Sequence, residues 1–83
     1  MKELTCCQDS VWAQVLDLPS ASGFEYILGK CETCGTPWMN VFCVASSITG
    51  FEPISQNDVA KIHSITDYAE LKQFLREWGD ANL

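Results

Sequence analysis

The sequence predicts a small α+β domain built on a central β-hairpin, and three observations support this fold class. Two segments alternate apolar residues with period two, a pair of closely spaced cysteines separates them, and the C-terminal third repeats apolar residues at helical spacing. The 83 residues suffice for one domain over residues 1–83. Because the core of so short a chain gives a thin stability margin, a bound metal ion would contribute much of the stability.

A short N-terminal helix is expected over residues 11–16. Asp9 or Ser10 can cap it, and Pro19 ends it. Its apolar residues share one face at helical spacing: Val11, Trp12, Val15 and Leu16. Residues 18–23 have the small and helix-breaking residues of a loop.

The two alternating segments predict the strands of the hairpin. The first begins at Phe24, and the second spans residues 37–45. The second segment contains so little charge that we expect both of its faces to be covered. Residues 51–54 can add a short third strand, which Pro53 confines to the edge of the sheet.

Two C-terminal helices are predicted after the strands. Ser55 with Asp58 resembles a capping box at the start of the first helix, and Asp67 with Glu70 repeats it for the second. Gly79 is well placed to end the second helix, so the polar tail that follows is expected to fray. The most regular helical stripe in the chain belongs to this helix and should pack against the hairpin: Leu71, Phe74, Leu75 and Trp78.

The run Cys31-Glu32-Thr33-Cys34-Gly35 has the pattern of half a tetrahedral metal site. Two thiolates separated by two residues can point at one ion when the backbone makes a tight turn, and zinc is the ion expected for such ligands. Gly35 can adopt the left-handed backbone conformation that this turn needs. We therefore predict one zinc ion per chain, with Cys31 and Cys34 among its ligands.

This pattern resembles the knuckle turn of zinc ribbons and rubredoxins, which lies between two strands. The resemblance covers residues 26–43. It implies a zinc site that a second pair of cysteines would complete. A standard ribbon has a second Cys-x-x-Cys knuckle, whereas this chain has the adjacent residues Cys6 and Cys7.

Cys6 and Cys7 are the candidates for the remaining ligands. Because neighbouring side chains point apart in extended backbone, one of them is favoured over both, with Cys6 preferred. The other thiol, Asp9, His63 or water can fill the fourth position. Cys43 lies on an apolar strand, where it is expected to be buried as a small hydrophobic residue, and it is a reserve ligand.

The charge balance limits the class of partner. The chain has 5 Lys and Arg against 11 Asp and Glu, which gives a formal net charge of −6. Such a chain repels phosphate backbones, so binding to nucleic acid is not expected. A protein partner with a basic surface is favoured instead.

The apolar runs are too short for a membrane span, so no membrane partner is expected and the protein is expected to be cytoplasmic. Thiols are kept reduced in that compartment. The five cysteines are therefore interpreted as metal ligands plus a buried thiol, and not as disulfides.

The sequence lacks the motifs of phosphate loops, nucleophile elbows and zinc proteases, and we predict a protein that is not an enzyme. The favoured role is that of a protein-interaction adaptor, a regulator or an immunity-like inhibitor. The alternative is a thiol redox or metal-handling protein that uses Cys31 and Cys34. A thioredoxin-type pair would lie at a helix N-terminus, whereas Gly35, Pro37 and a strand follow this pair.

Overall fold

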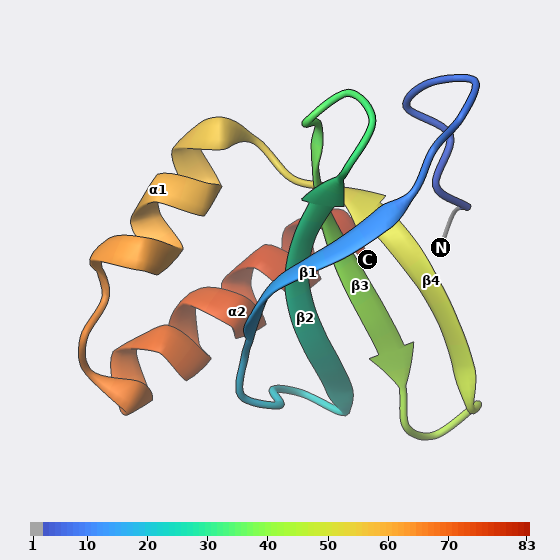
Figure 1. Cartoon of the computed structure of the whole chain (residues 1–83). Coiled ribbons are helices and arrows are strands. Elements are labelled where there is room, and N and C mark those ends of the chain that lie inside the picture. The colour runs from blue at the N-terminus through green and yellow to red at the C-terminus, as the bar shows by residue number, and fades with distance from the viewer. Residues whose placement is uncertain (1–2) are drawn as a thin grey trace.

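Two helices cover one face of a four-stranded antiparallel sheet in the computed structural model, which describes residues 3–83 (Figure 1). The strands lie in the order β1-β2-β3-β4, so each strand pairs with its neighbours in the sequence. The elements in chain order are β1 (Trp12–Asp17), β2 (Phe24–Cys31), β3 (Pro37–Cys43), β4 (Ile48–Pro53), α1 (Gln56–Ser64) and α2 (Tyr68–Asn82). The α+β class is confirmed, with four strands in place of the two or three expected.

The central hairpin is confirmed as strands β2 and β3. Tyr26 and Leu28 of β2 face the helices and are almost fully buried. Their partners across the hairpin, Val41 and Met39, share this face and are fully buried. Trp38 projects from the other face of β3 and is also buried, so this part of β3 is covered on both faces, as its low charge predicted.

The expected N-terminal helix is wrong, because residues 12–17 form strand β1. The register against β2 shifts between Gln14 and Leu16, which makes Val15 an extra residue in the strand. This bulge interrupts the period-two pattern and leaves the apolar residues at a spacing that also fits a helix. Pairing with β2 satisfies the backbone groups of a segment that is too short to form a stable helix by itself.

The strand expected at residues 51–54 is longer than the sequence indicated. It forms β4, which begins at Ile48 and pairs with β3 along its whole length. The position at the edge of the sheet is confirmed. Pro53 is the last residue of β4, where its missing N–H costs the sheet little.

Both helices begin where the sequence predicted. The Ser55 hydroxyl accepts a hydrogen bond from the Asp58 N–H at 3.1 Å, and the Asp67 carboxylate accepts one from the Ala69 N–H at 3.3 Å. Each side chain satisfies a backbone donor that the helix leaves unpaired. Within residues 3–83, neither helix is long and apolar enough to cross a membrane.

The apolar stripe of α2 packs against the sheet as expected. Leu75 and Trp78 are buried in the same cluster as the hairpin residues. The rings of Trp78 and Tyr26 pack edge to face, with their centroids 6.0 Å apart. Leu71 and Phe74 lie at the margin of this cluster and are half-buried. The stripe therefore contributes two full core residues and two partial ones.

Helix α2 does not end at Gly79, and this expectation is wrong. The helix continues to Asn82, whose side-chain amide donates a hydrogen bond to the Trp78 carbonyl at 2.8 Å. Gly79 is buried against Tyr26, and a Cβ at this position would lie 2.5 Å from the tyrosine hydroxyl oxygen. Glycine is needed here to let the helix approach the sheet.

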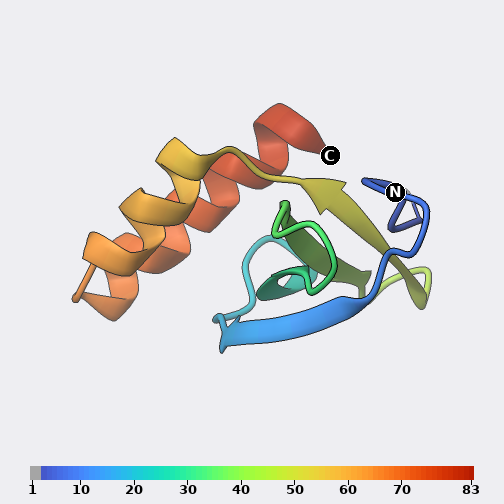
Figure 2. The same ribbon diagram turned by 45° about the horizontal axis from the view of Figure 1, so that its top comes forward.

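The second face of the sheet lies away from the helices, and we call it the open face. Figure 2 shows both helices on one side of the molecule and β1 on the other. Trp12 of β1 lies against Gly29, where a Cβ would overlap the indole ring, and its ring centroid lies 5.0 Å from that of Phe51 in β4. Trp12 therefore bridges the two edge strands across one end of the open face.

Candidate metal centre

Four cysteines from two distant segments meet at one end of the sheet. Cys6 and Cys7 precede β1, Cys31 is the last residue of β2, and Cys34 lies in the turn before β3. Their sulfur atoms all lie within 4.8 Å of one another. The cluster contains all four of the cysteines that the sequence analysis selected, and they lie close enough to hold a metal ion.

The turn between β2 and β3 brings Cys31 and Cys34 together. The Gly35 N–H donates a hydrogen bond to the Cys31 carbonyl at 2.8 Å, and the Cys31 N–H donates one to the Thr36 carbonyl at 2.9 Å. Gly35 has a φ of 79°, the left-handed conformation that the sequence predicted. The turn is therefore closed by backbone hydrogen bonds on both sides of the cysteine pair.

Ser10 shapes the N-terminal cysteine pair. Its hydroxyl oxygen accepts a hydrogen bond from the Cys7 N–H at 3.2 Å and donates one to the Cys7 carbonyl at 2.8 Å. These bonds hold the chain in a turn, so the rule that neighbouring side chains point apart in extended backbone does not apply to Cys6 and Cys7. Both sulfurs reach the cluster, whereas the sequence analysis favoured only one of them.

Two hydrogen bonds fasten the N-terminal segment to the turn. The Glu32 N–H donates to the Val11 carbonyl at 2.7 Å, and the Thr33 hydroxyl donates to the Asp9 carbonyl at 2.5 Å. These bonds extend the contact between the two segments beyond the last pair of the β1-β2 ladder, Trp12 with Cys31. The placement of the four sulfurs is thus fixed by the backbone around them.

The sulfur atoms form two close contacts across the segments. Cys7 Sγ lies 3.7 Å from Cys31 Sγ, and Cys6 Sγ lies 3.3 Å from Cys34 Sγ. All four are free thiols. Cys31 is fully buried and Cys34 is exposed, so the cluster lies at the surface with one side open to solvent.

The surroundings of the thiols affect their protonation differently. Burial acts to raise the pKa of Cys31, but hydrogen bonds from the backbone, led by that of Cys34, outweigh it and lower the pKa to about 6. The side chain and backbone of Thr36 lower the pKa of Cys34. The Ser10 hydroxyl lowers the pKa of Cys7, yet burial and the neighbouring sulfurs prevail and raise it to about 11. Because metals bind thiolates, a metal ion would displace the Cys7 proton.

The other candidate ligands lie outside this cluster. His63 is exposed on α1, and Asp9 contributes its backbone carbonyl to Thr33 and does not join the group of ligand atoms. Cys43 ends β3 and is half-buried, which corrects the expectation of full burial. Hydrogen bonds from Ser46 lower its pKa.

Three polar residues shape the site without having been assigned to it from the sequence, namely Ser10, Thr33 and Thr36, and Ser10 was expected only as a helix cap. One signal was available, because a serine three residues after Cys7 is typical of a turn closed by a side-chain hydroxyl. That spacing indicates a bent backbone at the adjacent cysteines. The two threonines gave no comparable signal.

Comparisons with known proteins add no assignment to this geometry. The chain matches no protein-family model, and neither the curated proteins nor the solved structures give a match.

Proposed function

We propose that the chain is a small zinc-stabilised domain that acts without catalysis, through contact with another protein in the cytoplasm. The observation that carries this proposal is the group of four cysteine sulfurs within 4.8 Å of one another. Zinc bound to four thiolates at about 2.3 Å places neighbouring sulfurs about 3.8 Å apart. The 3.7 Å between Cys7 and Cys31 is close to that spacing.

The ligand set favours zinc and a structural role. Magnesium, calcium and manganese prefer oxygen ligands, whereas a tetrahedral set of four sulfurs is typical of zinc or iron, and zinc is the ion of closed structural sites with four cysteines. A catalytic zinc site keeps a position open for water or substrate, whereas four thiolates fill the tetrahedron. The resemblance of residues 31–35 to the knuckle of zinc ribbons supports the same conclusion.

The charge of the chain supports a protein partner with a basic surface. The formal net charge is −6, and four thiolates around one zinc ion would make it more negative. Nucleic acids and anionic membrane surfaces would be repelled at physiological salt. An adaptor, a regulator or an immunity-like inhibitor would fit these properties.

The test is a binding experiment with the zinc-loaded chain. Proteins captured on the immobilised chain would be purified and titrated against it by calorimetry at about 150 mM salt, the physiological ionic strength. We expect a saturable complex with a protein that has a basic surface, and no complex with the Cys31→Ser/Cys34→Ser variant. Tight binding of the same chain to duplex DNA or RNA, with no protein complex, would contradict the proposal.

A second candidate function is thiol redox or metal handling, which the exposure of Cys34 and its 3.3 Å sulfur contact with Cys6 favour. Thiol alkylation separates the two functions. A structural site protects its cysteines until a chelator removes the ion, whereas a redox pair forms and loses a disulfide reversibly in a glutathione buffer. That cycle in a folded, metal-free protein would favour the redox function.

A further inference from the structure

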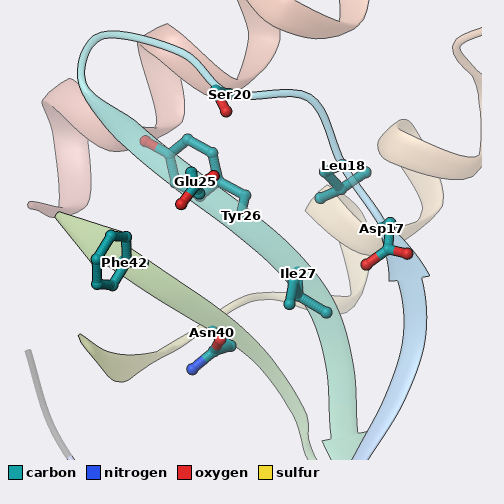
Figure 3. Close-up of a pocket in the computed structure, with 8 residues that line it drawn as sticks. All are labelled: Asp17, Leu18, Ser20, Glu25, Tyr26, Ile27, Asn40 and Phe42. Atoms are coloured by element: carbon teal, nitrogen blue, oxygen red, sulfur yellow. The ribbon is translucent and has the colours of Figure 1, made fainter. Parts of the chain in front are cut away.

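The open face of the sheet contains a pocket at the end away from Trp12. Its volume is about 300 Å³. Figure 3 shows side chains from β1, β2 and β3 around it, with the helices behind the sheet. The lining residues are Asp17, Leu18, Ser20, Glu25, Tyr26, Ile27, Asn40 and Phe42.

The strand register places most of these side chains on the open face, whereas Tyr26 faces the helices. Ile27 pairs with Asp17 on one side and with Asn40 on the other, so the three form a row across β1, β2 and β3. Glu25 pairs with Phe42 in the next row. The pocket therefore combines an apolar floor with carboxylates at its rim.

The carboxylates and the amide of the open-face residues offer acceptors to the pocket, and the Ser20 hydroxyl can accept as well as donate. The Asn40 amide nitrogen donates to the Gly50 carbonyl at 3.2 Å, which commits the amide N–H groups to β4 and leaves the side-chain oxygen as an acceptor. Figure 3 shows this nitrogen directed away from Ile27. Asp17 accepts a hydrogen bond from the Gln14 amide at 2.9 Å, and this neutral donor does not cancel the charge of the carboxylate.

Charge is distributed unevenly between the two sides of the sheet. Within residues 3–83, no Lys or Arg lies on the open face. Strand alternation places the Lys30 side chain on the helix-covered side, where it lines a groove with Val59 of α1. The other Lys and Arg residues that the structure describes lie on the helices: Lys61, Lys72 and Arg76. Cys31 has the same strand parity as Ile27, so a thiolate-rich metal centre at that end would add negative charge to the open face.

We propose that this pocket binds an arginine side chain of the partner protein. This inference rests on the proposed function, because it names the surface through which the domain would act. The apolar part of an arginine would lie on Ile27 and Phe42, while its guanidinium group would donate to the carboxylates of Asp17 and Glu25. Arginine suits the site better than lysine, because its planar fork of donors can reach several acceptors and stack on an aromatic ring.

The test is an NMR titration of the zinc-loaded, isotopically labelled chain with N-acetyl-arginine amide. We expect saturable shifts with a millimolar dissociation constant, largest at the backbone amides of Asp17, Glu25, Ile27, Asn40 and Phe42. N-acetyl-citrulline amide has nearly the same shape without the charge and should give no such shifts. Glu25→Gln should weaken binding about fivefold to tenfold, because a charge-assisted hydrogen bond becomes a neutral one.

Glu70→Gln is the matched control, because it removes the same charge from an exposed position on α2. It should leave the affinity unchanged. Equal weakening by Glu70→Gln, equal binding of citrulline or of N-acetyl-lysine amide, or the absence of localised shifts would each overturn the arginine pocket. Zinc content and melting temperature are measured on the same samples. A chain that binds zinc but does not bind the arginine probe disproves the arginine pocket and does not contradict the proposed function.

Discussion

The two ends of this molecule are held together in different ways. Beneath the helices, β2 and β3 contribute fully buried apolar residues that meet Leu75 and Trp78 of α2. At the cysteine end, the residues next to the cluster are mostly exposed, and the N-terminal segment is joined to the turn by a few hydrogen bonds. The first region has the apolar burial that stabilises a fold by itself, whereas the second does not.

The comparison suggests a division of roles between burial and metal. The helix-covered core can form whether or not a metal is bound, because its contacts are between apolar side chains. The segment of residues 3–11 has no strand or helix and depends on the cysteine cluster and on its contacts with the turn. Changes at the cysteines should therefore act first on the N-terminal segment and β1.

The largest effect is expected from Cys31→Ser. Free energies of structural zinc binding are comparable to the whole free energy of unfolding of a small domain, so losing this buried ligand should abolish zinc binding and lower the melting temperature markedly. Elemental analysis and differential scanning calorimetry measure the two effects. Cys43→Ser is the matched control, because it removes a thiol outside the cluster and should retain the zinc.

The next effect tests the helix-covered core. Leu75 is fully buried, so Leu75→Ala should lower the free energy of unfolding by about 2–5 kcal/mol while zinc stays bound. Phe74 is half-buried in the same helix, and Phe74→Ala should cost less, about 1–2 kcal/mol. Urea denaturation of the zinc-loaded variants gives both values. A larger cost for Phe74→Ala would mean that the core lies elsewhere on α2.

A smaller effect is expected at the link between the two regions. A Cβ at Gly29 would overlap the ring of Trp12 and approach the Ala13 carbonyl, so Gly29→Ala should destabilise the fold by about 1–3 kcal/mol through overpacking. Replacing Trp12 by valine in the same chain should recover part of that loss, since the two sites are coupled. Strictly additive costs in a denaturation cycle would disprove the contact between Trp12 and Gly29.

The smallest effect on stability concerns Cys43. It is half-buried, and Ser46 lowers its pKa, so this thiol should be the first to react when the zinc-loaded protein is alkylated near neutral pH. Mass spectrometry should show one modified cysteine per chain before chelation and five after it, because the chain has five cysteines. Rapid modification of all five without chelator would show that the cluster leaves its thiols unprotected.

The sequence was most informative where one local pattern dominated. The alternation from Phe24, the caps at Ser55 and Asp67, and the turn at Gly35 all predicted features that the structure confirms. Each of these signals comes from residues close together in the chain.

Two of the errors came from contacts between distant residues. The bulge at Val15 gave the β1 sequence the apolar spacing of a helix. The pairing of β1 with β2 is not visible in the sequence of β1 alone. Gly79 looked like a helix end, because its contact with Tyr26 is invisible in the sequence. The expectation that only one of Cys6 and Cys7 reaches the site failed for a local reason, because the hydrogen bonds of Ser10 bend the backbone at this pair.

Native mass spectrometry combined with thermal melting, with and without a chelator, tests the central claim most directly. We expect a zinc-loaded mass corresponding to one ion per chain, and a large fall in melting temperature once the chelator removes the ion. Re-adding zinc should restore both the mass and the melting curve. A freshly purified chain with no bound metal, and a melting curve that chelation leaves unchanged, would contradict the claim that the four cysteines form a structural zinc site.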